Sequence, residues 1–518
     1  MARINSNIPS LIAQANLNRT QGEMGIRLER LSTGLKINRG KDDPAGLIIS
    51  ERIRSNIQSV ETGVKNTERA SAMLSTTEAS LTEVNDLLNS IRSLMVESAN
   101  TGANSQAERD ANQLQIDSAI ESITRISNTA SFGSLKLLNG TLDYTLSGLR
   151  TSAVSIANIT NASFVGATSL QVEVDVTASA QVGALYYNGN TTPAGVILSA
   201  MTLEIAGPNG VQVIEIQSGQ PLNKLVTAVN NLTALTGVEA SLINGVAASG
   251  MVFKSSEYGS DAFVSVKRLG GPGPAGDSFD LFKFSSDRAM EEPNPFPWSS
   301  FLTGGELISG ERDTGKDVQA LINGNLANGR GLSVKVNSPS LGLDMLLTED
   351  AATMPTATAS NFYITGGGSL FQLGPDVTAA QQATVGIPSV AASRLGATLV
   401  GGAVQYLSSL KSGQAYSIAS NVRTGDFSGA SDILTNAIDQ VTELRGRLGA
   451  FERNVLETNQ RSLQSQFENL SASESSIRDA DFAYETSKLT RAQILSSAGT
   501  STLQLANQQS QQVLQLLG

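Results

Sequence analysis

Cysteine and histidine are absent from this chain of 518 residues. Without cysteine it has no disulfide, no thiolate nucleophile, no Fe–S cluster and no cysteine-based zinc site. Without histidine it has no Ser–His or Cys–His catalysis and no imidazole metal site. Only carboxylate, lysine (including Ser–Lys) or tyrosine chemistry remains. Because the candidate motifs for such chemistry are better interpreted as turns and helix caps, we expect no enzyme, no cofactor and no bound metal.

Basic residues and long apolar runs are also scarce. Lys and Arg total 36 against 47 Asp and Glu, a net charge of −11, which suits neither nucleic acid nor an anionic membrane. No run of about eighteen apolar residues occurs, and the first 17 residues lack the apolar stretch of a signal peptide. We predict no nucleic-acid partner and no membrane partner. By signal alone the chain would be cytosolic, unless another export route handles it.

Aromatic residues make up only 5% of the chain, against 40% hydrophobic residues, so the core must be mostly aliphatic. Proline is nearly absent from residues 1–140 and absent from 431–518, and both stretches have a helical pattern. Residues 141–430 are instead rich in Gly, Ser, Thr and short β-branched runs. The pattern predicts an α+β fold in which helical ends meet and a β-rich region is inserted between them.

The helical ends carry seven-residue repeats, which place a narrow apolar stripe along a long helix that then needs a partner helix. The alternative is an ordinary helix bundle closed within the chain. A helix expected from about Pro44 to Ala99 would span roughly 80 Å, which suits a rod. The predicted rod-packing residues are Ile53, Val60, Leu74, Leu81, Leu88, Leu434, Val441, Leu448 and Val455.

The two extreme ends are poor in charge, and residues 492–518 contain no charged side chain at all. We expect both ends to be disordered alone and buried in an assembly. Ordering about 40 residues costs on the order of 40–80 kcal/mol of backbone entropy, which roughly 1,600–3,200 Å² of apolar burial would offset. That is the size of an obligate interface. The predicted core-packing residues are Leu28, Leu31, Leu35, Leu489, Leu503, Val513 and Leu517.

The middle of the chain is predicted to form strands and short helices. Alternation from Leu170 to Val176 predicts a strand, and residues 203–216 around Pro208-Asn209-Gly210 predict a hairpin. Residues 316–336 are expected to repeat a helix-then-strand order. Residues 310–316 (GERDTGK) resemble a phosphate-binding loop but are followed by Asp in place of Ser or Thr, so we expect a turn before a helix.

Adjacent carboxylates at Asp42 with Asp43, and at Asp479 with Asp481, suggest paired catalytic acids at first sight. Each pair precedes a predicted helix, where an Asp side chain caps free backbone N–H groups. We therefore predict that these residues are helix caps.

Several motifs resemble bacterial flagellin. Residues 31–38 (LSTGLKIN) with 41–46 (KDDPAG) resemble its N-terminal signature, and 477–483 (IRDADFA) with 491–495 (RAQIL) resemble its C-terminal signature. Residues 202–266 are similar to a module inserted in many flagellins and hook proteins. The resemblance divides the chain into terminal assembly helices at 1–42 and 478–518, a helical rod at 43–145 and 431–477, and outer domains at 146–430 with the module at about 200–270.

The resemblance implies a subunit that self-assembles into the helical flagellar filament for swimming and leaves the cell through the flagellar type III apparatus. It implies a secretion chaperone, a filament cap and hook-junction proteins as partners. It also implies an innate immune receptor surface at Arg92, Leu94, Val96 and Gln115, although Gln115 and Ser90 stand where Glu and Arg are usual. The alternatives are a hook–filament junction protein and an outer domain displayed as an adhesin or glycan-binding module.

Overall fold

The computed structural model describes residues 7–162, 164, 168–189, 194–270, 279–285, 293–338, 340–354, 360–400 and 402–515, with backbone only from residue 510. The chain forms two compact units. The terminal unit comprises Met1–Ser71, Gln372–Gln382 and Glu452–Gly518, and the central unit comprises Ala72–Phe371 and Ala383–Phe451.

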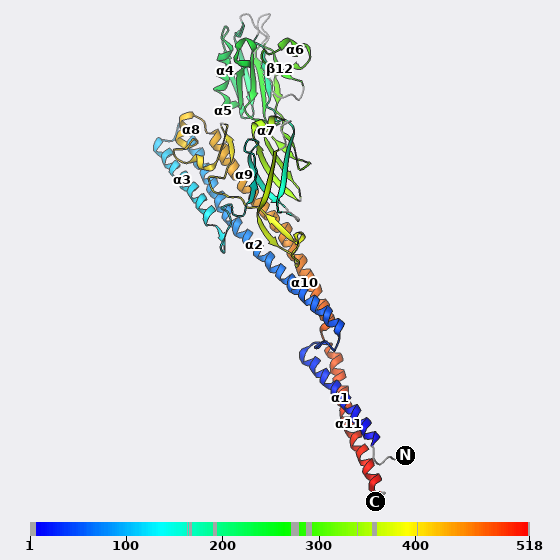
Figure 1. Cartoon of the computed structure of the whole chain (residues 1–518). Coiled ribbons are helices and arrows are strands. Elements are labelled where there is room, and N and C mark those ends of the chain that lie inside the picture. The colour runs from blue at the N-terminus through cyan, green and yellow to red at the C-terminus, as the bar shows by residue number, and fades with distance from the viewer. Residues whose placement is uncertain are drawn as a thin grey trace. The chain divides into compact units, whose positions relative to one another are not determined.

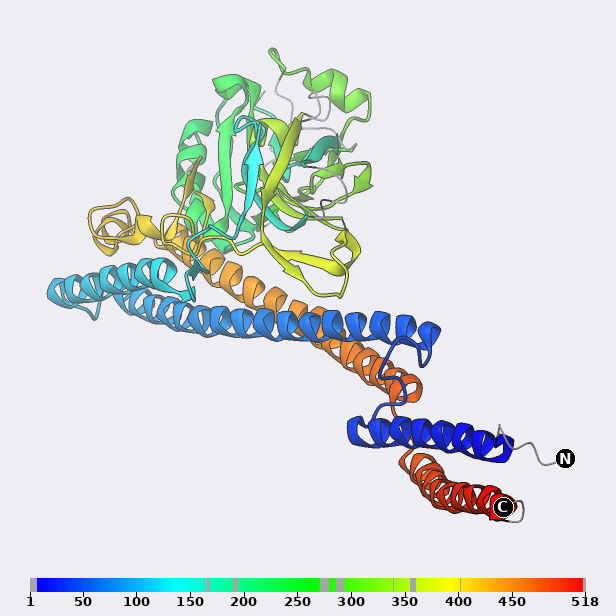
Figure 2. The same ribbon diagram turned by 60° about the horizontal axis from the view of Figure 1, so that its bottom comes forward.

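The terminal unit is helical. Its elements are α1 (Ile8–Thr33), the first half of α2 (Pro44–Ala99), a π-helical turn η5 (Glu452–Leu456), α10 (Glu457–Arg478) and α11 (Phe482–Gln515). Helices α1 and α11, from opposite ends of the sequence, lie side by side (Figures 1 and 2). This confirms the prediction that the two helical ends meet.

The helix boundaries follow from local chemistry. Asp43 accepts a hydrogen bond from the backbone of Gly46 (2.9 Å) at the start of α2, and Asp481 accepts one from the backbone of Tyr484 (3.0 Å) at the start of α11. Of the four predicted caps, Asp43 and Asp481 are confirmed, whereas Asp479 lies at the C-terminal end of α10 and accepts a hydrogen bond from the side chain of Ser475 (2.6 Å). Asp42 instead accepts from the backbone N–H groups of Asn38 and Arg39 and so closes the loop before α2.

The π-helical turn shifts the seven-residue repeat of the C-terminal helices. Before it, α9 (Ser428–Phe451) buries Val441 and Leu448. The extra residue of a π turn moves the next buried position by one, so that Leu456 is 1% exposed while Val455 is only half-buried. The buried stripe therefore continues through Leu456 and Leu463, in place of the predicted Val455.

The helical part of the central unit contains the second half of α2, then α3 (Gln106–Thr129), α8 (Ile418–Thr424) and α9. Ser105 and Glu108 form a capping box at the start of α3. Two small hairpins belong to this unit: β1 (Ser131–Phe132) with β2 (Leu135–Lys136), and β23 (Thr398–Val400) with β24 (Ala403–Gln405). The strands β21 (Ser369–Gln372) and β22 (Gln382–Val385) pair with each other, and the segment Gln372–Gln382 between them is part of the terminal unit.

The first β module is a two-sheet sandwich. One sheet has the strand order β16-β15-β5-β20-β3 and the other β17-β18-β19-β4. The strands are β3 (Tyr144–Ser147), β4 (Val154–Ala162), β5 (Leu170–Ala178), β15 (Gln319–Ile322), β16 (Asn325–Leu326), β17 (Asn328–Arg330), β18 (Ser333–Asn337), β19 (Leu341–Leu347) and β20 (Ser360–Gly367), and the short helix α7 (Glu349–Thr353) follows β19. Val172, Val174 and Val176 of β5 face the core, as their alternation predicted.

The expected helix in residues 316–336 is wrong, because Gln319–Ile322 is strand β15 and pairs with β5. Val318, Ala320 and Ile322 are all buried, which is a period of two. Asn323 and Gly324 then both have positive φ, 50° and 76°, and this conformation makes a tight hairpin turn into β16. The segment therefore does not repeat the helix-then-strand order, and residues 310–316 do not precede a helix.

The second β module spans residues 184–314 and is also a sandwich, with sheets ordered β13-β12-β6-β10-β9 and β14-β11-β7-β8. Its strands are β6 (Ala184–Tyr187), β7 (Met201–Gly207), β8 (Gly210–Ile216), β9 (Val238–Leu242), β10 (Met251–Ser255), β11 (Phe263–Leu269), β12 (Leu281–Phe284), β13 (Leu307–Ser309) and β14 (Arg312–Thr314). The predicted hairpin is β7–β8. Helices α4 (Leu222–Asn230), α5 (Thr233–Thr236) and α6 (Trp298–Thr303) complete the module.

The observed architecture is α+β, with long helices from both termini and β-rich modules between them in sequence. Within the described residues, no helix is both long and apolar enough to cross a bilayer.

Candidate self-assembly site

The site is the pair of terminal helices, whose contact follows a three-four spacing on both sides. The contact positions, all buried or half-buried, are 10, 13, 17, 20, 24, 27 and 31 on α1 and 485, 489, 492, 496, 499, 503 and 506 on α11, and Glu29, Arg30 and Lys488 are half-buried beside them. Such spacing is typical of the positions at which two paired helices contact each other, and we call the contact positions the seam. Ala13, Ala492 and Ala506 are the apolar residues buried there, at 8%, 4% and 9% exposure.

Small side chains allow α11 to approach α1 closely. A Cβ placed on Gly499 would lie 3.3 Å from Cδ1 of Leu17, which is tighter than an ordinary contact. At the far end of the pair, Asn7 donates to the carbonyl of Ala506 (3.1 Å), and Ser10 donates to the side chain of Asn507 (2.8 Å). The two helices therefore run antiparallel, because the start of α1 lies beside the late part of α11.

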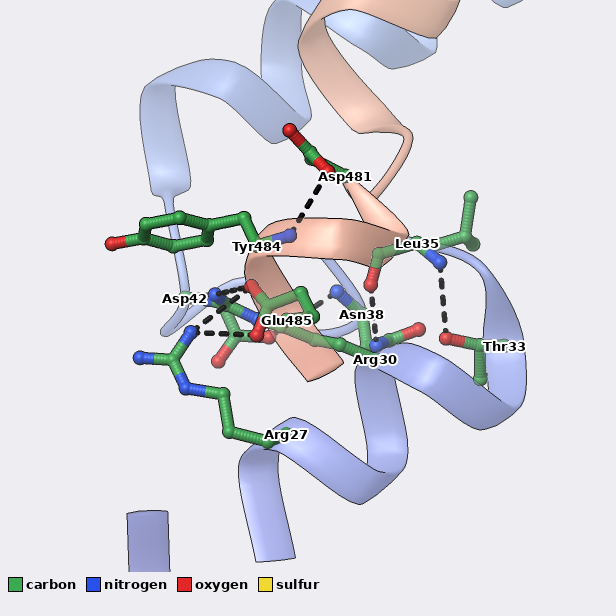
Figure 3. A network of polar contacts seen from close by, with 9 residues as sticks. All are labelled: Arg27, Arg30, Thr33, Leu35, Asn38, Asp42, Asp481, Tyr484 and Glu485. Atoms are coloured by element: carbon green, nitrogen blue, oxygen red, sulfur yellow. Dashed lines mark hydrogen bonds and ion pairs between the residues drawn. The ribbon is translucent and has the colours of Figure 1, made fainter. Parts of the chain in front are cut away.

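A buried ion-pair cluster lies at the opposite end of the seam (Figure 3). Glu485 is 3% exposed. Arg27 Nη1 donates to both of its carboxylate oxygens, at 3.0 and 2.8 Å, and Arg30 Nη1 donates to Oε1 at 3.0 Å. Arg27 and Arg30 are three residues apart and so lie on one face of α1. One carboxylate thus ties two arginines of α1 to the first turn of α11.

The arginines also control the ionisation of Glu485. Burial by itself raises the pKa of a carboxyl group, but the hydrogen bonds from Arg27 and Arg30 favour its charged form. Their effect exceeds that of burial, and the pKa of Glu485 lies below its ordinary value. Glu485 is therefore ionised at neutral pH, and the cluster carries a net charge of one positive unit.

The connections next to this cluster are joined by backbone hydrogen bonds. Lys36 donates its N–H to the carbonyl of Arg478 (2.6 Å), and Ala480 donates to the carbonyl of Gly34 (2.9 Å). The link between α1 and α2 is thereby held against the link between α10 and α11. Arg478 adds an ion pair with Glu51 of α2 (2.9 Å).

Away from the seam, both terminal helices expose large apolar side chains. Ten of them are between 39% and 66% exposed, with several above one half: Ile8, Leu11, Ile12, Ile26 and Leu28 on α1, and Phe482, Tyr484, Ile494, Leu495 and Leu505 on α11. We call these ten residues the outward apolar face. Large apolar side chains that are left exposed on two adjacent helices are available to pack against another molecule.

The predicted core-packing residues fall into three groups. Leu31, Leu489 and Leu503 lie on the seam and are half-buried, and Leu35 is half-buried just after α1. Leu28 is 49% exposed and belongs to the outward apolar face. Val513 lies on α11 without a described side chain, and Leu517 lies outside the described residues.

Most of the predicted rod residues are buried. Seven are at most 2% exposed: Val60, Leu74, Leu81, Leu88, Leu434, Val441 and Leu448. Ile53 and Val455 are half-buried. Of the predicted receptor surface, Arg92, Val96 and Gln115 are exposed on α2 and α3, whereas Leu94 is half-buried.

The Glu485 cluster was not predicted from the sequence. Glu485 is the last Asp or Glu residue in the chain, and Arg27 and Arg30 stand three residues apart on a helix that also carries Arg19, Glu23 and Glu29. The isolation of Glu485 near an uncharged C-terminal stretch was an available signal. The pairing itself joins residues 455 and 458 positions apart, which no local pattern encodes.

Two family models match the ends of the chain. The bacterial flagellin N-terminal helical region matches residues 4–143, and the bacterial flagellin C-terminal helical region matches residues 431–517. A flagellin of Salmonella rubislaw is 30% identical over 526 residues and covers 99% of both chains. The chain belongs to the bacterial flagellin family. A flagellin of Salmonella typhimurium is 28% identical, also over 99% of each chain.

This flagellin is a structural subunit of the bacterial flagellar filament and is located outside the cell. The full-length matches to flagellins do not favour a hook–filament junction protein or a displayed adhesin. The polar flagellin F of Vibrio parahaemolyticus is 39% identical over 137 residues, 26% of this chain and 36% of that one.

Solved structures of other flagellar proteins are only weakly similar to this flagellin. The hook-associated protein-3 of Legionella pneumophila covers 82% of this chain and 97% of its own at 11% identity and a TM-score of 0.30. The flagellar cap protein FliD of Escherichia coli covers 48% of this chain and 64% of its own at 18% identity and a TM-score of 0.26. Such scores do not establish a shared fold.

Proposed function

We propose that the filament forms by packing the outward apolar faces of α1 and α11 against those of neighbouring copies. The exposure of ten large apolar side chains on these two helices is the observation that carries the proposal. The absence of charged side chains from residue 492 onward supports it, because a helix solvated on its own normally carries charge.

The terminal helices order only when a subunit joins the filament. Few apolar residues of the α1–α11 seam are buried, and those are alanines. Burying three alanines offsets little of the entropy of ordering two helices. The outward apolar face supplies the missing burial once neighbours cover it.

Different segments of the chain have different roles in the filament. Residues 1–42 and 478–518 form the filament core, 43–145 and 431–477 form the rod, and 146–430 form the outer domains, with an inserted module at about 200–270. Core packing uses Leu28, Leu31, Leu35, Leu489, Leu503, Val513 and Leu517, and rod packing uses the buried stripe of α2 and α9. The chain has a structural role and no enzymatic activity.

The proposed partners are those that a filament subunit meets. They are copies of itself, a secretion chaperone on the C-terminal helix, the filament cap and the hook-junction proteins. The exposed side chains of Arg92, Val96 and Gln115 form part of a surface for an innate immune receptor, together with Leu94.

Seeded polymerisation followed by electron microscopy tests this function. Leu505, 66% exposed on α11, is replaced by Asp, and Val246, 51% exposed in the second β module, is replaced by Asp as a matched control. We expect L505D to remain a soluble monomer and V246D to form filaments like the parent chain. A chain lacking residues 1–40 and 478–518 should also fail to polymerise. Normal filaments from L505D would contradict assembly through the outward apolar face.

A further inference from the structure

Strand β8 is an edge of the second β module. In the sheet ordered β14-β11-β7-β8 it pairs with β7 on one side, and among the described residues no strand covers its other side. The pairing with β7 is regular over the whole length, from Met201 opposite Ile216 to Gly207 opposite Gly210. Strand β8 therefore has no bulge that would prevent another strand from pairing with its free edge.

The side chains of β8 lack the usual protection of an edge. Natural edge strands carry Lys, Pro or a bulge, because an open row of backbone groups pairs readily with another strand. Here the outward positions are Val211, Val213 and Glu215, and the two valines are 55% and 50% exposed. Leu235 of α5 is 54% exposed, and its carbonyl oxygen lies 2.9 Å from a Cβ placed on Gly210, so α5 lies beside the first residue of β8.

We propose that β8 pairs edge to edge with β8 of a second copy of this chain. An antiparallel pair centred on Val213 aligns all seven residues of the strand. It places Val213 against Val213 and each Glu215 against Val211. Valine pairs are favourable across strands, and like charges directly opposite are unfavourable, so this register avoids the Glu215–Glu215 clash that a pair centred on Glu215 would create.

The pair is weak on its own and depends on the filament. A seven-residue strand pair is smaller than the about 1,200–2,000 Å² of a stable interface. Filament subunits hold their modules at an effective concentration that reaches about the millimolar range for short links, which favours weak contacts. The inference thus rests on the proposed self-assembly. Because the contact is two-fold, each module pairs with one other module only.

Cysteine cross-linking tests the pair, since the chain has no cysteine of its own. In either kind of antiparallel pair, opposed Cα atoms lie about 4.5 or 5.5 Å apart, within the range that a disulfide spans. Val213→Cys should therefore form a disulfide with its own copy. Glu215→Cys is the matched control on the same strand and face, because its own copy lies four residues along, about 14 Å away.

We expect filaments of the Val213→Cys chain to form disulfide dimers under mild oxidation at least tenfold faster than filaments of Glu215→Cys. Mixed filaments of Val211→Cys and Glu215→Cys should form the mixed dimer, which fixes the register. Adding Val213→Lys to both chains should abolish that dimer, because it opposes two lysines. If the rate of cross-linking is unchanged when the filaments are diluted, the paired modules belong to one filament. If the rate falls on dilution, the paired modules belong to two filaments.

Sedimentation of the same samples separates this inference from the proposed function. If filaments form normally and Val213→Cys cross-links no faster than Glu215→Cys, the β8 pair is wrong and self-assembly stands. If filaments do not form, self-assembly through the termini fails. The β8 pair is then decided by concentrated full-length chains, where Val213→Cys must still exceed Glu215→Cys.

Discussion

Replacing Glu485 with glutamine keeps the shape of the side chain and removes the negative charge between Arg27 and Arg30. Glu485 is 3% exposed, and the side chains of Arg27 and Arg30 are only 23% and 18% exposed. Removing one partner of a buried ion pair costs about 3–5 kcal/mol, because the remaining charge stays buried without compensation. The arginines retain some solvent, so we expect a loss of about 3 kcal/mol from the α1–α11 pair.

Since α1 and α11 order on assembly in the proposed mechanism, the loss should appear in the critical concentration for polymerisation. A tenfold change corresponds to about 1.4 kcal/mol, so 3 kcal/mol raises the critical concentration about a hundredfold. Sedimentation of filaments over a range of total protein concentration measures it directly.

Glu29→Gln is the matched control for this prediction. Glu29 pairs with Arg39 at 3.0 Å, but the two side chains are 35% and 62% exposed. An exposed pair contributes about 0–1 kcal/mol, so the critical concentration should change by at most about fivefold. Equal critical concentrations for E485Q, E29Q and the parent chain would refute the reasoning about the buried cluster.

The contribution of Glu485 to the stability of the α1–α11 pair should decrease as the pH falls. The pKa of Glu485 is lower in the folded state than its ordinary value, so its stabilising contribution is fully present above that ordinary value. The contribution is lost as the pH falls through the lowered pKa. The difference between the parent chain and E485Q should therefore be largest at neutral pH and should shrink below about pH 4. A difference that grows on acidification would contradict this assignment.

Three further substitutions test the helices. Leu81 is 0% exposed, and Leu81→Ala should lower the free energy of unfolding by about 2–5 kcal/mol in urea titrations; a loss below 1 kcal/mol would mean that the site is not packed. Asp481→Ala removes the cap of α11 and should raise the critical concentration about fivefold, for about 1 kcal/mol; an unchanged value argues against the cap. Gly63→Leu should lower the thermal midpoint of unfolding, because a Cβ placed on Gly63 lies 3.2 Å from Cδ1 of Leu463. Gly22→Leu is the control and should leave the midpoint unchanged, because a Cβ placed on Gly22 has no atom within 4 Å.

Much of the helical architecture could be predicted locally. The expected helix from Pro44 to Ala99 is the observed α2, because the cap at Asp43, the Pro at the first position and the seven-residue repeat all act within a few residues. Asp481 was recognised as a cap for the same reason. Leu31 and Leu503 were predicted as core-packing residues from their apolar spacing, and both lie half-buried between α1 and α11.

Two errors came from patterns that fit more than one structure. Val318, Leu321 and Ile322 fit a helix, yet the segment is a strand because β5 offers a pairing edge and Asn323 adopts positive φ. Val455 continued a perfect repeat, yet the π turn displaced the buried position to Leu456.

The starts of the long helices, much of their apolar stripe and the family of the chain could be predicted from the sequence, because these depend on neighbouring residues and on motifs. The approach of Glu485 to Arg27 and Arg30, and the position of β8 at a sheet edge that no other described strand covers, became evident only in the folded structure. Both depend on which distant segments become neighbours in space, and the energy of burying a charge or leaving an edge unpaired exists only once those neighbours are in place.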